Sequence, residues 1–241
     1  MEGRTPTGKD TPTGDDEHER RRLTVVSAGL REPSSTRLLA DRLSEATVAA
    51  LAQRGVSAEV TVVEVREHAH DLTNALSTGF ASPALQAALD AVIGADGLIA
   101  VTPIFSGSYS GLFKTFFDVI EDGALAGMPV LLGATAGTAR HSLALEHAIR
   151  PLFAYLRTLT APTGVFGATE DFGAAQPAAP APEPGSTVRA AATGSALAAR
   201  VHRAAGELAP LVLTRPARVG LQPPTALAAP TSFEQLLTGR R

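Results

Sequence analysis

Three short segments of the chain concentrate hydroxyl groups, glycines and other small residues, and each one directly follows an apolar run. The first segment, residues 27–37, places Ser34, Ser35 and Thr36 where a helical pattern begins, with Arg31 close by. A helix N-terminus presents free amide donors and partial positive charge, so it stabilises a phosphate group. The segment therefore predicts a phosphate site, and simple N-capping of the helix is the alternative interpretation.

The second segment, residues 102–111, combines a proline and two glycines with two aromatic residues. The glycines allow the backbone to approach a flat ligand, and Phe105 or Tyr109 could pack against that ligand. Amides near Phe105 and Ser106 could meet heteroatoms on a ring edge. The segment superficially resembles a GxSxG nucleophile motif, but Tyr109 stands at the nucleophile position, so a serine hydrolase is not supported. A tight turn whose aromatic residues join the core is the alternative.

The third segment, residues 133–142, is again rich in small residues and ends near His141. A histidine without a partner carboxylate nearby in the sequence is typical of a surface or packing residue, so we predict no catalytic role for it. His68, His70 and Asp71 lie too close together in one short loop to predict a metal site.

The 241-residue chain contains no cysteine, which excludes disulfides, thiolate nucleophiles and cysteine-ligated metal or iron–sulfur sites. Any redox chemistry must therefore come from a bound organic cofactor. The first segment contains neither GxxxxGKS/T nor GxGxxG, so it predicts neither a P-loop nor a Rossmann dinucleotide grip. A formal net charge of -3 gives no indication of a nucleic acid or an anionic membrane as partner.

Elements that would position these segments alternate along the chain. Short apolar runs predict strands at residues 23–27, 60–63, 98–101, 130–132 and 165–166. Helical patterns occupy residues 38–51, 83–92, 112–120, 142–159 with a kink at Pro151, and 188–208. This alternation predicts a flavodoxin-like three-layer α/β sandwich with a five-stranded parallel sheet. Ligands bind at the carboxyl ends of strands in such sheets, which is where all three segments fall.

Composition divides the chain further. Residues 1–22 are polar and lack the apolar stretch of a signal peptide, so we expect a disordered leader. Residues 23–173 form the expected domain, and residues 174–187 a stiff Pro/Ala-rich linker. Residues 188–241 would hold one helix and an irregular tail after Pro210. No apolar run is long enough to cross a bilayer, and we expect a cytoplasmic protein.

Residues 102–118, TPIFSGSYSGLFKTFFD, resemble the TPxYxxSxSGxxKTxxD segment of NAD(P)H-dependent FMN reductases. Residues 134–141 are similar to the third flavin loop of that family, and the resemblance runs from about Leu23 to Phe172. Within the family, the chain most resembles the reductase partners of luciferase-like or alkanesulfonate monooxygenases.

The resemblance implies a flavodoxin-like fold, a homodimer or homotetramer, and FMN held by the three segments. Carried over position by position, the phosphate would be bound by Arg31, Ser34, Ser35 and Thr36, and the ring system by Pro103, Ile104, Phe105, Ser106, Thr135, Ala136 and Gly137. Two positions depart from the family: Gly29 stands where a serine is frequent, and Phe105 replaces the usual tyrosine. Both changes would weaken flavin retention, which suits a reductase that releases its product.

The implied activity is hydride transfer from NADPH or NADH to FMN, which supplies reduced flavin to a two-component monooxygenase. That chemistry needs positioning and no indispensable side chain. A quinone, azo or chromate reductase with bound FMN is an alternative, as is a non-enzymatic flavin electron carrier. Arg31, Arg37 or Arg140 could meet the 2′-phosphate of NADPH, so the preferred nicotinamide stays open.

Overall fold

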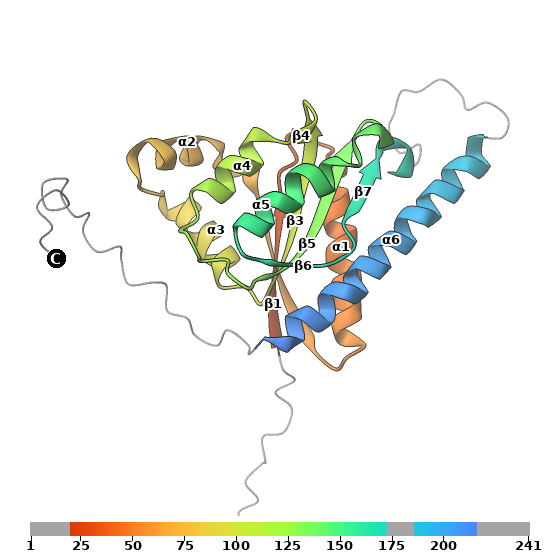
Figure 1. Ribbon diagram of the computed structural model, residues 1–241, viewed down its shortest axis with the longest axis horizontal. Coiled ribbons are helices and arrows are strands. Elements are labelled where there is room, and N and C mark those ends of the chain that lie inside the picture. The colour runs from red at the N-terminus through yellow and green to blue at the C-terminus, as the bar shows by residue number, and fades with distance from the viewer. Residues whose placement is uncertain (1–19, 173–185, 216–241) are drawn as a thin grey trace, which may run out of the picture.

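The computed structural model describes residues 20–172 and 186–215, which form a parallel sheet covered by helices on both faces (Figure 1). The strands are β1 (Arg20–Ser27), β2 (Ser57–Glu64), β3 (Gly97–Phe105), β4 (Ser108–Tyr109), β5 (Pro129–Ala136), β6 (Leu159–Thr160) and β7 (Val165–Ala168). The order across the sheet is β2-β1-β3-β5, and both β6 and β7 pair with β5. All these pairs are parallel, while β4 folds back antiparallel onto β3. This is a doubly wound, flavodoxin-like order, and the predicted fold is confirmed.

Helices α1 and α6 cover one face of the sheet, and α2 to α5 cover the other (Figure 1). The α-helices are α1 (Ser35–Ala52), α2 (Ala69–Thr78), α3 (Pro83–Ile93), α4 (Gly111–Asp118), α5 (Arg150–Tyr155) and α6 (Ser186–Thr214). The 3-10 turns are η1 (Val65–His68), η2 (Ala139–His141) and η4 (Thr169–Phe172), and η3 (Leu145–Ile149) is a π-helical turn. No helix of the described ranges is long and apolar enough to span a membrane.

Successive residues of the central strands face opposite layers, as the two-residue period of a strand requires. Val25 and Ile99 belong to the core beneath α1 and α6, whereas Val26 and Ala100 belong to the core beneath α2 to α5. The three phenylalanines of α4 lie on a face that helical periodicity alone could assign to the core or to an interface. They are 0–2% exposed, and Phe113 and Phe117 pack against Phe153 of α5. They are core residues.

Several boundaries differ from the sequence prediction. Strand β1 begins at Arg20, three residues earlier than expected, because its first residues pair with β2 through their backbone whatever their side chains are. Strands β3 and β5 continue to Phe105 and Ala136, through residues that the sequence assigned to turns. Helix α2 and the short strands β4 and β6 were not predicted.

The helix expected to span residues 142–159 is interrupted, as Pro151 suggested. The π-helical turn η3 runs directly into α5, which has Pro151 in its first turn. Proline has no amide donor, so the regular helical hydrogen-bond pattern is broken at this point. Helix α6 was expected to stop before Pro210 but continues to Thr214, with Val212 buried. The predicted leader and linker, and the tail beyond residue 215, fall almost wholly outside the described residues.

Candidate functional site

The three segments singled out in the sequence meet at one edge of the sheet. They follow β1, β3 and β5, which are neighbours and run parallel, so their carboxyl ends lie side by side. A direct hydrogen bond joins the first segment to the third: Thr36 Oγ1 lies 2.8 Å from Thr135 Oγ1, and both residues are 4% exposed. Residues 99 positions apart thus form one buried polar contact.

The first segment is the turn between β1 and α1. Ser34 is the N-cap of α1, and its Oγ accepts a hydrogen bond from the Arg37 amide at 3.1 Å. The capping interpretation is therefore correct for Ser34. The amides of Ser35 and Thr36, in the first turn of the helix, have no helical acceptor and suit an anion. Arg31 lies on the exposed part of the turn.

Gly29 lies at the tightest point of this turn. A Cβ atom on Gly29 would lie 2.1 Å from Ser34 Oγ and 3.2 Å from Thr36 Cβ. A serine at this position would collide with the capping hydroxyl where it now lies. The position of Ser34 therefore explains why this chain has a glycine where a serine is frequent in the family.

The second segment is a β-hairpin. Ser106 and Gly107 connect β3 to β4 and have φ values of 50° and 82°, the positive pair of a two-residue hairpin turn. Pro103 and Ile104 are buried in β3, while Phe105 is 48% exposed at the tip. Tyr109 packs beside Phe113 instead, with ring centroids 6.1 Å apart. One aromatic residue thus joins the core and the other stays on the surface.

The third segment leaves the sheet at Ala136. Thr135 pairs in register with Pro103, so the second and third segments share one position along the edge. Gly137 and His141 are exposed, and within the described residues no polar partner contacts the His141 side chain. The edge therefore combines free helix amides, buried hydroxyls and a half-exposed aromatic ring. These features fit a phosphate ester that carries a planar head.

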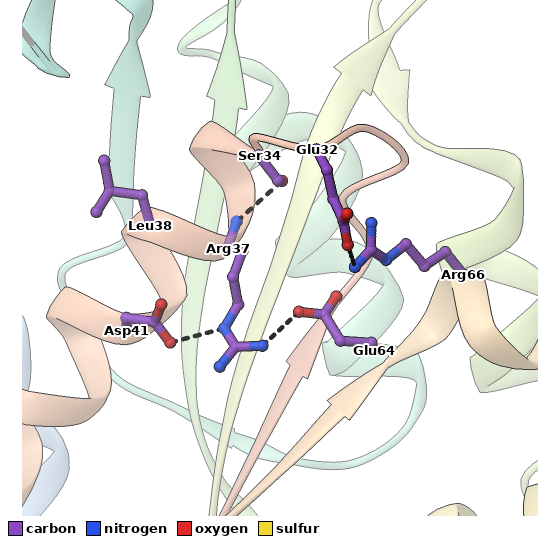
Figure 2. A pocket seen from close by; sticks show the side chains of 7 residues that line it. All are labelled: Glu32, Ser34, Arg37, Leu38, Asp41, Glu64 and Arg66. Carbon is purple, nitrogen blue, oxygen red and sulfur yellow. Dashed lines mark hydrogen bonds and ion pairs between the residues drawn. The ribbon is translucent and has the colours of Figure 1, made fainter. Parts of the chain in front are cut away.

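A cavity of about 300 Å³ lies beside the first segment, on its β2 side (Figure 2). It is lined by Glu32, Ser34, Arg37, Leu38, Asp41, Glu64 and Arg66. Ser34 and Arg37 were singled out from the sequence, whereas Glu32, Asp41, Glu64 and Arg66 were not, because charged residues in a loop or on a helix surface are common. The available signal was topological: Glu64 ends β2, which neighbours β1, so it had to lie near the first segment.

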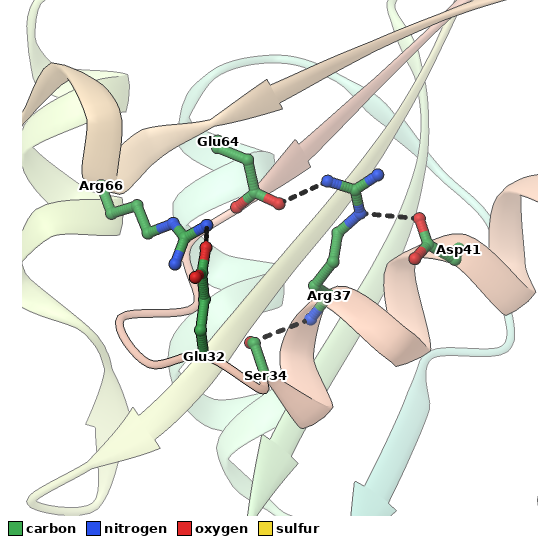
Figure 3. Close-up of polar contacts among 6 residues, drawn as sticks. All are labelled: Glu32, Ser34, Arg37, Asp41, Glu64 and Arg66. Carbon is green, nitrogen blue, oxygen red and sulfur yellow. Dashed lines mark hydrogen bonds and ion pairs between the residues drawn. The ribbon is translucent and has the colours of Figure 1, made fainter.

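Two ion-pair systems hold the walls of this cavity together (Figure 3). Arg37 donates from Nε to Asp41 at 2.7 Å and from Nη1 to Glu64 at 2.6 Å, and Arg66 pairs with Glu32. The hydrogen bonds from Asp41 and Glu64 raise the pKa of Arg37, so it is a cation at every working pH. Because two carboxylates occupy its guanidinium, Arg37 is not the free cation that the sequence offered to a 2′-phosphate.

The histidines near α2 do not build a metal site. In residues 20–172 and 186–215, no group of three or more histidine or acidic side chains is placed to hold a metal ion. Asp71 instead accepts a hydrogen bond from Ser82 Oγ at 2.6 Å, and Ser82 caps α3.

The fold and its carboxyl-edge site define a flavodoxin-like oxidoreductase. The chain resembles the X-ray structure of an oxidoreductase from Corynebacterium diphtheriae, with a TM-score of 0.72, 45% identity, and coverage of 83% of this chain and 100% of that one. The chain belongs to the NADPH-dependent FMN reductase family, whose model matches residues 21–173.

Curated relatives agree with this assignment. An FMN reductase (NADPH) of Pseudomonas aeruginosa is 40% identical over 151 residues, which cover 63% of this chain and 78% of the relative. The NADH-dependent FMN reductase SfnE of Pseudomonas putida is 35% identical over 189 residues, which cover 78% and 91%. The family, enzyme class and cofactors predicted from the sequence, FMN and a nicotinamide nucleotide, are confirmed.

Proposed function

We propose that this chain passes a hydride from NADPH or NADH to FMN and releases the reduced flavin to a flavin-dependent monooxygenase. The convergence of three segments at one sheet edge, tied by the Thr36–Thr135 hydrogen bond, carries the proposal. Bound FMN supplies the hydride acceptor. The chain supplies the geometry in which donor and acceptor meet.

Each segment has its own role in binding. The amides of Ser35 and Thr36 hold the phosphate at the start of α1, with Ser34 ordering the turn and Arg31 adding positive charge from its exposed position. The ring system is lined by Pro103, Ile104, Phe105 and Ser106 on one side, and by Thr135, Ala136 and Gly137 on the other. The hydroxyls of Thr36 and Thr135 join the two halves of this site.

An open site supports release of the product. Phe105 is 48% exposed, and Ser106 and Gly137 are exposed as well, so the ring-binding edge faces solvent. The tyrosine hydroxyl that the family uses at this position is missing. We therefore propose that flavin dissociates after reduction, in the cytoplasm, where reduced nicotinamide nucleotides are available.

We also propose a homo-oligomer. Leu143 and Tyr155, on either side of the π-helical turn, are 65% and 77% exposed. Large apolar side chains left exposed on a surface are typical of a subunit interface. Light scattering of the purified chain measures its mass directly, and a monomer at working concentration would contradict this assignment.

The test of the activity uses the purified full chain with FMN and each nicotinamide nucleotide, and follows the loss of nicotinamide absorbance. We expect oxidation that depends on added FMN and continues for many turnovers in air. A quinone in place of FMN serves as the comparison acceptor. Flavin binding without nicotinamide oxidation would refute the enzyme and leave a flavin carrier.

We propose that no side chain is essential for hydride transfer, and His141 offers a test because it is exposed on the third segment. We expect His141→Ala to keep hydride transfer within about threefold of the unmodified protein, since no acid–base step is needed. Loss of nearly all transfer while FMN still binds would overturn this expectation. Stopped-flow reduction of bound FMN separates the two effects.

A further inference from the structure

We propose that the cavity between α1 and the end of β2 binds the adenosine half of a nucleotide, with Glu64 holding the ribose. The inference rests on the proposed function, because the two molecules in that reaction that can carry an adenosine are FAD, taken in place of FMN, and the nicotinamide nucleotide. Both present the same adenosine 5′-phosphate. The site differs from the flavin edge and lies on the opposite side of the first turn.

Glu64 ends its strand beside the first helix. In the Rossmann class of doubly wound folds, an acidic residue after the glycine-rich first turn accepts a hydrogen bond from the adenosine ribose, beside a phosphate held at the first helix. This chain lacks that glycine-rich turn but has an acidic residue at the end of its second strand. Here Glu64 is the last residue of β2 and lies in register with Ser27, the last residue of β1. The phosphate-binding turn begins at the next residue.

The carboxylate of Glu64 is nearly buried and is bonded through one of its two oxygens. Its side chain is only 11% exposed, yet among the described residues Arg37 alone bonds to it, through Oε1. Figure 3 shows the carboxylate of Glu64 between the guanidinium groups of Arg37 and Arg66. The second oxygen, Oε2, retains its acceptor capacity for ribose hydroxyls.

The remaining walls suit a purine. Arginine guanidinium planes stack on aromatic rings, and Arg37 and Arg66 are both held in place by carboxylates. Leu38 adds an apolar contact, since it is 39% exposed on the cavity side of α1. The volume of about 300 Å³ is at the small end of ligand pockets, and it suits a nucleoside better than a whole dinucleotide.

Ser34 connects this cavity to the flavin edge. It lines the cavity and also caps the helix whose amides would hold the flavin phosphate. A second phosphate that continues from the first would pass Ser34 and bring an adenosine into the cavity that Leu38, Arg37 and Glu64 line (Figure 2). This path fits FAD, and an adenosine that approaches from solvent fits the nicotinamide nucleotide.

The experiment titrates the flavin-free full chain with FMN and with FAD, using the quenching of flavin fluorescence, and measures nicotinamide binding by calorimetry. Leu38→Trp fills the cavity from a half-exposed position, and Glu64→Gln removes the charge while keeping an acceptor. Glu59→Gln is the matched control, because Glu59 lies on the same strand with its side chain 53% exposed and outside the cavity. Circular dichroism checks that each variant is folded.

We expect Leu38→Trp to weaken one adenosine-bearing ligand by about tenfold or more, with Glu64→Gln acting in the same direction and Glu59→Gln unchanged. A loss for FAD with FMN unaffected assigns the cavity to FAD. A loss for NADPH or NADH with both flavins unaffected assigns it to the nicotinamide nucleotide. Equal losses for FMN and FAD, or no loss for any ligand, would overturn the proposal. None of these readouts requires turnover, so a failure of the reductase activity is recognised separately.

Discussion

The hydroxyl oxygens of Thr36 and Thr135 lie 2.8 Å apart, and both residues are buried. Because solvent does not reach them, each hydroxyl depends on the other for its hydrogen bond. Thr135→Val keeps the shape of the side chain and leaves the Thr36 hydroxyl buried without its partner. We expect the flavin-free protein to lose about 1–3 kcal/mol of stability, measured by urea unfolding, together with weaker FMN binding. Thr73→Val on the exposed face of α2 is the control, and an equal effect there would contradict this explanation.

Phe105 is the second residue whose chemistry can be tested alone. It is 48% exposed at the hairpin tip, where the family's tyrosine carries a hydroxyl. We expect Phe105→Tyr to tighten FMN binding by about threefold to tenfold, because the added hydroxyl supplies a hydrogen bond at the ring edge. Phe80→Tyr makes the same chemical change at a 70% exposed position on another part of the surface. Unchanged or weaker FMN binding in Phe105→Tyr would refute the role given to this position.

Among the elements, the π-helical turn and α5 pack on the core through Leu145, Ile149 and Phe153, and one arginine adds their polar attachment to β6 and the loop after it. Arg150 donates to both oxygens of Glu146, to Thr160 Oγ1 at 3.0 Å, and to the Ala161 and Pro162 carbonyls. We expect Arg150→Ala to cost about 2–4 kcal/mol, because several acceptors lose their donor at once. Arg150→Lys keeps the positive charge but lacks the several fixed donors of a guanidinium group. It should therefore recover less than half of that loss in urea unfolding.

The same pair gives α5 a pH dependence. The hydrogen bond from Arg150 is the main cause that lowers the pKa of Glu146 in the folded protein. A carboxyl with a lowered folded pKa stabilises the fold above its unfolded pKa, roughly 4.3, and loses that contribution as the pH falls through the folded value. We expect the stability difference between the unmodified protein and Glu146→Gln to be greatest above about pH 5 and to shrink below pH 4. A difference that stays constant over this range would contradict the assignment.

Elements were predictable from the sequence where side-chain pattern and backbone pairing agree. The apolar runs that became β1, β2, β3, β5 and β7 were found for this reason. Arginines open β1, Thr102 and Pro103 interrupt the apolar run of β3, and small residues end β5, so these strand ends could not be read from hydrophobicity. The hydrogen bonds that pair the strands involve only the backbone. The convergence of the three segments was predictable because each follows a strand of one parallel sheet, and the carboxyl ends of such strands lie at the same edge. The pairing of Thr36 with Thr135 was not, because register across the sheet is a tertiary property.

The whole molecule depends on α6, although this helix follows the predicted linker and lies beyond the region that the family model matches. Its buried residues pack on α1 and the sheet: Leu197, Val201, Ala204, Ala205, Leu208, Ala209 and Val212. Glu207 accepts hydrogen bonds from the Thr163 amide and hydroxyl at 2.7 and 2.8 Å, and Arg200 pairs with Asp171 at 3.5 Å. Helices α1 and α6 together thus cover this face of the sheet (Figure 1).

This docking sets a steric condition on the start of β3, more than a hundred residues away. A Cβ on Gly97 would lie 2.6 Å from Val212 Cγ2, and a β-branched side chain has little rotational freedom with which to withdraw. We expect Gly97→Ala to cost about 1–3 kcal/mol in urea unfolding, as overpacking does. Val212→Ala alone should also destabilise, because it leaves a void. The double variant should be more stable than the sum of the two losses predicts, since the deleted methyl groups make room for the added one. Strictly additive losses would mean that α6 does not press on Gly97, and that this face of the sheet is closed in some other way.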